Sequence, residues 1–103
     1  MDRIELHFLV AEELRKMTAI ARDVFPFAND VRVHMRFVDG DKTQFQVEIP
    51  YSGSQWDISV DLVTRGTILA GYVRQLAPEA SGGLARLAEE DGQWSGTVEP
   101  TYE

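Results

Sequence analysis

The strongest constraint on the fold is an alternation of apolar and polar residues over positions 43–62, on both sides of Ser52-Gly53. A two-residue turn at Ser52-Gly53 would place apolar residues opposite each other across a β-hairpin. The apolar positions are Phe45, Val47, Ile49, Tyr51, Trp56, Ile58, Val60 and Leu62. Because a slip of one residue would turn one strand's apolar side chains towards water, the pattern also predicts the register.

A second turn, Asp39-Gly40-Asp41, follows an alternating stretch at residues 31–37. A three-residue loop is a common hairpin connection, with glycine near the left-handed position. This loop length predicts the pairs 36 with 44, 34 with 46 and 32 with 48. The two turns together predict a three-stranded antiparallel meander with residues 43–51 as its central strand.

Two helices are expected to pack on this sheet. Residues 3–10 alternate and predict a first strand, whereas residues 11–25 carry apolar side chains at helical spacing. Helical spacing returns at residues 65–77. Residues 84–91 are predicted to form a short helix, and residues 92–103 a tail or an edge strand. No internal repeat is evident.

The predicted fold class is therefore α+β, a β-α-β-β-β-α two-layer sandwich with one open, polar sheet face. Residues 1–91 form a single α+β domain, followed by the segment 92–103. The predicted core consists of Ile4, Leu6, Phe8, Leu14, Met17, Ile20, Val24, Val33, Met35, Phe37, Phe45, Val47, Ile49, Ile58, Val60, Leu69, Val73 and Leu76.

Composition narrows the class of partner. The chain has 103 residues, a formal net charge of -7, 44% hydrophobic residues and no cysteine. The negative charge disfavours nucleic acids and anionic membranes. No apolar run approaches the roughly 18 residues of a membrane span. A cytoplasmic location is expected by default, and disulfides and thiolate metal sites are excluded.

The open sheet face carries the candidate partner-binding residues, because its polar side chains are predicted to line up in rows across three strands. These residues are Arg32, His34, Arg36, Glu48, Asp57 and Asp61. The rows run from basic side chains through amides to acidic ones, which suits the charged surface of a partner. The alternative interpretation is a solvated face whose cross-strand charges pair with each other.

The search for catalytic and metal-binding chemistry gives nothing positive. His7 and His34 lack a third ligand with zinc spacing. The segment 39–43 resembles the start of a calcium loop, but Pro50 stands where the bidentate glutamate belongs. Nucleophile elbows, HExxH pairs and thiol nucleophiles are missing from the sequence. No catalytic residue, metal ligand or cofactor is therefore predicted, and the chain is not expected to be an enzyme.

Two classes of function follow. The first is a small acidic protein-interaction domain, such as an inhibitor, immunity protein, secretion chaperone or complex subunit. Its partner would be another protein with a basic surface, and a homodimer is compatible with this class. The alternative is a small-molecule-binding domain or small enzyme, with a pocket between sheet and helices near Trp56, Tyr72 and His34.

Overall fold

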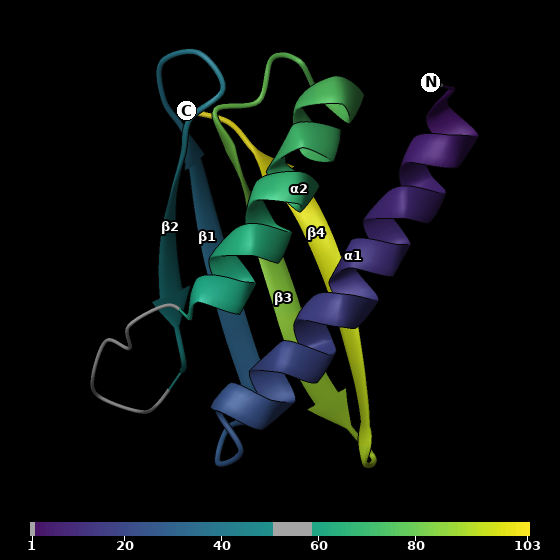
Figure 1. Cartoon of the computed structure of the whole chain (residues 1–103), viewed down its shortest axis with the longest axis vertical. Coiled ribbons are helices and arrows are strands. Elements are labelled where there is room, and N and C mark those ends of the chain that lie inside the picture. Colours follow the sequence, from purple (N-terminus) through teal and green to yellow (C-terminus); the bar gives the residue numbers. More distant parts are fainter. Residues whose placement is uncertain (1, 51–58) are drawn as a thin grey trace.

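The computed structural model describes residues 2–50 and 59–103. The described elements are α1 (Arg3–Val24), β1 (Asp30–Phe37), β2 (Thr43–Glu48), α2 (Val60–Leu76), β3 (Gly82–Glu90) and β4 (Gln93–Thr101). The four strands form one antiparallel sheet in the order β2-β1-β3-β4, and both helices cover the same face (Figure 1). The α+β class is confirmed, but the order is α-β-β-α-β-β, so the predicted β-α-β-β-β-α order is wrong.

Residues 3–10, predicted as a strand, form the first turns of helix α1. The Asp2 carboxylate caps this helix by accepting a backbone N–H of the first turn at 2.8 Å. The side chains of Ile4 and Phe8 are 83% and 70% exposed, so only half of the alternating apolar set is buried. The buried residues recur at helical spacing: Leu6, Val10, Leu14, Met17 and Ala21. Positions 6 and 10 fit both periods, which is why the alternation was misleading.

The hairpin of β1 and β2 has the predicted register. The observed pairs include Arg32 with Glu48, His34 with Gln46, and Arg36 with Gln44. The backbone N–H of Val38 donates to the Lys42 carbonyl at 3.0 Å and closes the loop. Gly40 has φ +71°, the left-handed conformation that the turn requires. This half of the predicted meander is confirmed.

The second predicted hairpin is not confirmed. Its turn at Ser52-Gly53 lies outside the described residues, and Val60 and Leu62, expected in a strand, belong to α2. The Ser59 hydroxyl caps α2 by accepting the N–H of Leu62 at 3.1 Å. The other neighbour of β1 in the sheet is therefore β3.

Residues 84–91, predicted as a short helix, lie almost entirely in strand β3. Leu84 and Leu87 have helical spacing, but in the strand they point to opposite faces, with Leu87 fully buried and Leu84 half-buried. Gly82 allows β3 to approach β1, because a Cβ there would lie 2.1 Å from the Met35 carbonyl oxygen. Most of the segment 92–103 forms the edge strand β4, which pairs with β3 along its length.

The element order contains one α-β-β unit twice, related by an approximate two-fold axis between β1 and β3. On this axis Val33 lies opposite Ala85, and both are fully buried. Adding 52 to a residue number in α1 or β1 gives the equivalent position in α2 or β3. Met17 and Leu69, for example, are equivalent and are both fully buried. The structure thus contains a repeat that the sequence does not make evident.

The connectors between helix and strand follow the same symmetry. Their sequences are Phe25-Pro26-Phe27-Ala28-Asn29 and Ala77-Pro78-Glu79-Ala80-Ser81. The last carbonyl of each connector accepts a backbone N–H from the opposite unit. Asn29 accepts from Glu89 at 2.8 Å, and Ser81 accepts from Phe37 at 2.9 Å. The two units are therefore tied together beyond the central strand pair.

In each half of the domain, a bulky side chain packs against a glycine, but the glycine lies on the helix in one half and on the strand in the other. In one half Gly66 of α2 faces Phe45 of β2, and a Cβ on Gly66 would lie 2.8 Å from the ring. In the other half Leu14 of α1 faces Gly96 of β4, where an added Cβ would lie 3.1 Å from Leu14 Cβ. Each helix thus packs closely on its strand through a single glycine, placed on the helix in one half and on the strand in the other.

The core lies between the helix layer and the sheet. Its buried hydrophobic residues are Leu6, Val10, Leu14, Met17, Ala21, Phe25, Val31, Val33, Met35, Val47, Ile49, Leu62, Leu69, Ala70, Val73, Ala85 and Leu87. Of the predicted core, Ile4, Phe8 and Val60 are exposed and Val24 is 40% exposed. These errors all lie where strand and helix were confused or where a helix ends. Ile58 lies outside the described residues.

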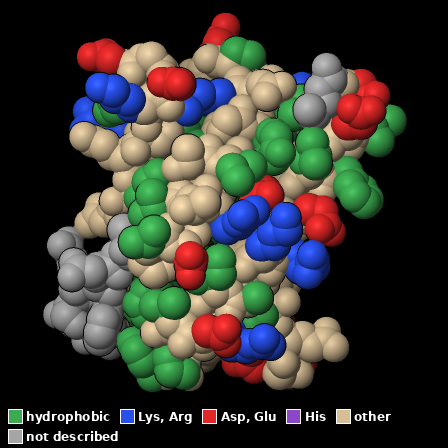
Figure 2. All heavy atoms as spheres, viewed as in Figure 1, with side chains coloured by type: hydrophobic (Ala, Val, Ile, Leu, Met, Phe, Trp, Pro, Cys, Tyr) green, Lys and Arg blue, Asp and Glu red, His purple; other side chains and the backbone are tan. Residues whose placement is uncertain are grey.

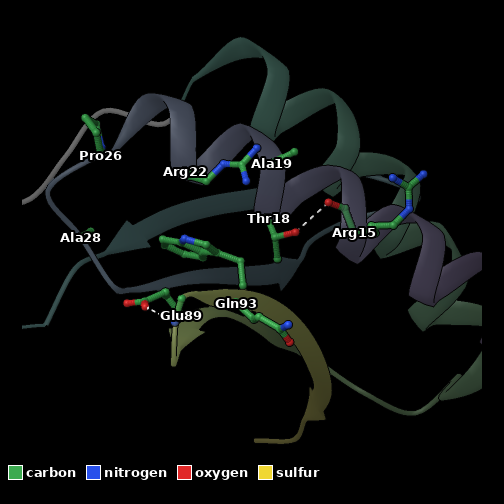
Figure 3. Close-up of a pocket in the computed structure, with 10 residues that line it drawn as sticks. Arg15, Thr18, Ala19, Arg22, Pro26, Ala28, Glu89 and Gln93 are labelled. Atoms are coloured by element: carbon green, nitrogen blue, oxygen red, sulfur yellow. Dashed lines mark hydrogen bonds between the residues drawn. The ribbon is translucent and has the colours of Figure 1, made fainter.

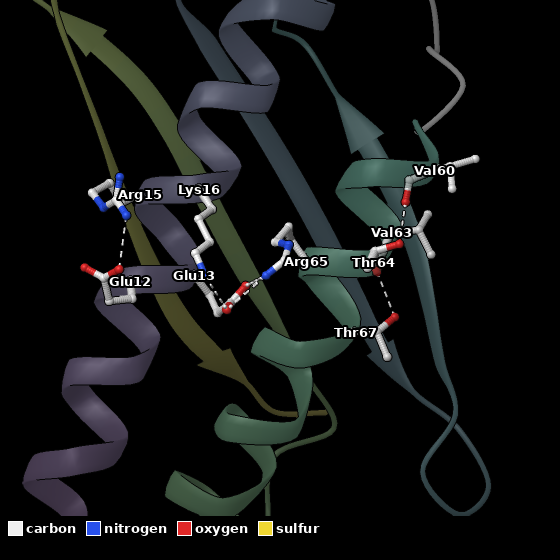
Figure 4. A network of polar contacts seen from close by, with 9 residues as sticks. All are labelled: Glu12, Glu13, Arg15, Lys16, Val60, Val63, Thr64, Arg65 and Thr67. Atoms are coloured by element: carbon white, nitrogen blue, oxygen red, sulfur yellow. Dashed lines mark hydrogen bonds and ion pairs between the residues drawn. The ribbon is translucent and has the colours of Figure 1, made fainter.

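A buried ion pair joins the two helices (Figure 4). Glu13, only 6% exposed, lies 3.4 Å from Nη1 of Arg65 and 3.7 Å from Nζ of Lys16. Glu13 and Arg65 are equivalent positions of the two units, so the pair lies at the two-fold axis. The carboxylate is satisfied from both helices, which fixes their relative position.

The helical assignment of residues 3–10 can be tested with two neighbouring apolar residues. In a strand Leu6 and Phe8 would share one face, whereas in α1 Leu6 is buried and Phe8 is exposed. We expect Leu6→Ala to lower the free energy of unfolding by about 2–3 kcal/mol. We expect Phe8→Ala to change it by less than about 0.5 kcal/mol. Urea unfolding measures both; equal losses would contradict the helix.

The Glu13–Arg65 pair predicts non-additive stability effects. Arg65→Ala leaves the buried carboxylate with Lys16 alone, so we expect a loss of about 1–3 kcal/mol. The double replacement Glu13→Leu with Arg65→Met removes both charges, and we expect it to unfold at nearly the wild-type urea concentration. A double variant that loses as much as the sum of the Glu13→Leu and Arg65→Met single variants would show that the charges do not interact.

Candidate partner-binding face

The sheet has one face with no described helix over it. Because side chains alternate along a strand, burial of Val33 and Val47 under the helices places their neighbours on the opposite side. We call this opposite side the bare face. Its central residues are Gln44, Gln46 and Glu48 of β2, Arg32, His34 and Arg36 of β1, Leu84 and Arg86 of β3, and Thr97 and Glu99 of β4.

Charged side chains on the bare face form a connected network. Arg32 lies between two carboxylates, 3.6 Å from Asp30 and 3.9 Å from Glu48. Glu48 also contacts His34 Nε2 at 2.9 Å, and Asp30 contacts Arg86 at 3.5 Å. The network spans β2, β1 and β3 at one level of the sheet. These cross-strand pairs hold the side chains in place and leave their outer surfaces open to water.

The network changes the acidity of Glu48. The hydrogen bond with His34 is the main reason that the pKa of Glu48 lies below its ordinary value. The nearby charges of His34 and Arg32 lower the pKa further, and desolvation partly opposes the shift. Glu48 is therefore an anion across the whole neutral pH range, and it is available as a charged acceptor on the bare face.

Two polar atoms of the network are enclosed without a hydrogen-bond partner among the described residues. They are Oδ1 of Asp30 and Nε of Arg32. Each residue already uses its other polar atoms in the ion pairs. Unsatisfied buried polar atoms are uncommon in folded proteins. This part of the bare face therefore keeps hydrogen-bonding capacity that the described chain does not use.

An apolar side chain lies in the middle of the bare face. Leu84 of β3 is opposite His34 on one side and Glu99 on the other, and it is half-buried. Leu84 is the only leucine, isoleucine, valine or aromatic residue among the central bare-face residues. A small apolar centre with charged residues around it is a typical arrangement in protein interfaces.

The structure brings together four of the six residues that the sequence predicted for partner binding: Arg32, His34, Arg36 and Glu48. Asp61 is not among them, because it lies exposed in the first turn of α2. Asp57 lies outside the described residues. The expected row of acidic side chains beside β2 is therefore not found in the described chain.

Sequence reasoning missed the contributions of β3 and β4 to this face. The sequence predicts Leu84 and Arg86 in a short helix, and Glu99 in a segment that is either a tail or an edge strand. The signal that could have found Arg86 is its alternation with the buried Ala85 and Leu87. That segment is short, and its apolar residues are equally compatible with a helix. The hydrophobic period alone therefore could not distinguish a strand from a helix.

Charge on the bare face is balanced, although the whole chain carries -7. The three arginines are matched by Asp30, Glu48 and Glu99. The acidic excess gathers instead at the two hairpin turns, which hold Asp39 and Asp41 at one end of the sheet and residues 89–91 at the other. On the helix side apolar, acidic and basic side chains lie intermixed (Figure 2).

A hollow lies between the C-terminal half of α1 and the β3–β4 turn (Figure 3). Its volume is about 670 Å³, and several of its polar side chains have partners within the chain. Thr18 donates to the Arg15 carbonyl at 2.7 Å, Arg15 pairs with Glu12 at 3.1 Å, and Glu89 accepts the Gly92 N–H at 2.8 Å. Arg15, Thr18 and Glu89 of this hollow are therefore already engaged within the chain.

A more enclosed groove of about 330 Å³ lies between the two helices and the end of β4. It is lined mainly by apolar side chains, with Arg3, His7 and Tyr102 as its polar members. Arg3 donates to the Leu76 carbonyl at 3.4 Å. The groove does not contain Tyr72 or His34, which lie on opposite sides of the sheet, and Trp56, the third residue of the expected pocket, lies outside the described residues.

The described residues contain no group of three or more His, Cys, Asp or Glu side chains that could hold a metal ion. Within the same ranges, neither helix combines the length and apolarity of a membrane crossing. Comparisons of the chain with protein-family models, curated proteins and solved structures each found no match. The function must therefore be inferred from the surface of the chain itself.

The ion pair of Glu48 can be tested by carboxyl NMR titration. We expect Glu48 to titrate below an ordinary glutamate, and His34→Ala to move its pKa back up. The stabilisation from Glu48 ionisation should be present above the ordinary pKa and should disappear as the pH falls through the lowered value. His7→Ala, on α1, is the matched control. An unchanged Glu48 pKa in His34→Ala would contradict the contact.

Proposed function

We propose that the chain is a protein-interaction domain that binds a partner protein through the bare face of its sheet. The observation that carries the proposal is the one-sided architecture, in which helices cover one face and an ordered charged network occupies the other. Inhibitors, immunity proteins, secretion chaperones and complex subunits are the kinds of protein that such a domain would include.

The size of the bare face suits a protein partner. The molecule measures 36 × 27 × 23 Å, so the sheet face is limited to roughly the rectangle of the two longer dimensions. That area is comparable to the roughly 800 Å² that each partner buries in a standard interface. The face is also built on strands, so binding would order little of the chain.

The chemistry of the bare face favours a partner of mixed charge with an apolar contact at its centre. Leu84 would be the apolar anchor, and the exposed charged groups of Arg36, Glu48 and Arg86 would be reached by hydrogen-bonding groups of the partner. A strongly basic partner surface would match the acidic hairpin turns better than it would match this charge-balanced face. The sheet itself therefore supports specificity more than long-range attraction.

A small-molecule function is supported by one observation, the groove of about 330 Å³ between the helices and β4. Its apolar lining and its few polar side chains fit the general character of ligand sites. It lacks a nucleophile paired with a base among its lining residues. The groove supports binding more than catalysis, and it is the second candidate.

The proposal can be tested by photo-crosslinking in the host cell. A photoreactive amino acid at Gln46, exposed on the bare face, should capture a defined partner, whereas one at Ala19, exposed on α1, should not. With that partner purified, Arg36→Glu should slow association on the order of tenfold at low salt, because bare-face charges meet the partner. Arg22→Glu, an equal charge change on α1, should have little effect.

Capture from Ala19 but not from Gln46 would contradict the proposal and assign binding to the helix layer. Equal effects of Arg36→Glu and Arg22→Glu on association would show that only net charge matters. Thermal melting of each variant provides the control for folding, since both arginines are exposed and neither replacement should unfold the domain.

A further inference from the structure

Strand β4 forms a free edge of the sheet. It is nine residues long and pairs with β3 on one side (Figure 1). No described element pairs with its other side. The opposite edge, β2, is six residues long. Of the two edges, β4 is the longer one.

The direction of each backbone group in β4 follows from the ladder. Asn29 bonds Glu89 and Ser81 bonds Phe37, so odd-numbered residues of β3 face β1 and even-numbered ones face β4. With Glu99 opposite Leu84, odd-numbered residues of β4 then face β3. The groups that point away from the sheet belong to the even-numbered positions: Trp94, Gly96, Val98 and Pro100.

This edge has few of the features that usually prevent strands from pairing. Its nine residues include one charged side chain, Glu99, and no lysine. Pro100 lies at an outward position near the C-terminal end, where its missing N–H leaves the ladder to β3 intact. Trp94, Gly96 and Val98 therefore present a continuous row of free donors and acceptors in the middle of the strand.

A hollow of about 270 Å³ runs beside this edge, between α1 and β4. Its lining includes Leu14 and Thr18 of α1 and Trp94 and Gly96 of β4. A strand added to β4 would direct every second side chain to the helix side of the sheet, next to this hollow. The edge thus offers both backbone pairing and space for side chains.

We propose that β4 pairs antiparallel with β4 of a second copy of this chain, with Gly96 opposite Gly96. Trp94 then lies opposite Val98 of the second copy, and each pair exchanges two backbone hydrogen bonds. A register shifted by two residues, with Gly96 opposite Val98, would place Pro100 opposite Trp94 and leave the Trp94 carbonyl without a donor. The proposed register avoids that loss.

The side chains favour a second copy as the occupant because the strand is complementary to itself in this register. Glu99 meets Gln93 of the second copy and not another acid, so no like charges face each other. Trp94 beside Val98 is an aromatic and β-branched pair of the kind that stabilises sheets. The bare faces of the two copies would then continue into one eight-stranded surface.

The register can be tested by disulfide formation, because the chain has no cysteine of its own. Ser95 should lie opposite Thr97 of the second copy in a non-hydrogen-bonded pair, with Cα atoms about 4.5 Å apart, a distance that suits a disulfide. An equimolar mixture of Ser95→Cys and Thr97→Cys chains should therefore cross-link more than either variant alone. Gln46→Cys, on β2, is the control for random collision.

The backbone bonds are tested by Val98→Pro, which removes an outward N–H, against Val98→Thr, which keeps it. Sedimentation equilibrium of the wild type should give twice the chain mass of 11.6 kDa. Val98→Pro should raise the dissociation constant on the order of tenfold or more, and Val98→Thr should change it less. Circular dichroism and thermal melting confirm that each variant is folded.

Three results would overturn the proposal. The first is a monomeric wild type at about 1 mM chain, where even a weak dimer is populated. The second is preferential cross-linking of Thr97→Cys with itself, which would assign the shifted register. The third is slow exchange of the β4 amides only after an unrelated extended peptide is added, which would assign the edge to another chain. None of these results depends on the bare face.

Discussion

The antiparallel pairing of β1 with β3 is the interaction on which the rest of the structure depends. It joins two α-β-β units at Val33 and Ala85, both fully buried. The helix of the first unit packs over β3 and β4, the strands of the second, and α2 packs over β2 and β3 (Figure 1). Neither unit covers its own apolar strands alone, so the two units must fold as one domain.

Local patterns predicted the parts of the fold that are held by local interactions. The β1–β2 hairpin has a short loop with a left-handed glycine and clean alternation, so both its existence and its register could be predicted. Residues 3–10 failed because Leu6 and Val10 satisfy helical and strand spacing alike. Two features favour the helix over the strand. Asp2 caps its N-terminus, and the buried residues continue at helical spacing beyond residue 10.

Only the part of the candidate site that lies on the β1–β2 hairpin could be predicted, because only that part is held by local interactions. Arg32, His34, Arg36 and Glu48 belong to the predictable hairpin, so they were placed correctly relative to each other. Arg86 and Glu99 reach the same face only through the β1–β3 and β3–β4 pairings. Such pairings join residues far apart in the chain, and no turn in the sequence specifies them. The exclusion of Asp61 likewise required knowing where α2 begins.

The two-fold repeat explains why the two edges of the sheet differ although the units share a plan. At the β2 edge the bulky partner is on the strand, with Phe45 packed against Gly66 of α2. At the β4 edge the bulky partner is on the helix, with Leu14 packed against Gly96. Each half packs one bulky side chain against one glycine, but the glycine lies on the strand at only one edge.

A strand with glycine at its centre allows another backbone to approach closely, whereas an edge built around Phe45 presents a ring. The glycine that accommodates Leu14 in the core therefore also allows another backbone to approach β4 closely. The repeat alone would make the β2 and β4 edges equivalent. The different placement of the glycine makes the two edges differ. In our proposals, the bare face binds a different protein and the β4 edge pairs with a second copy of this chain.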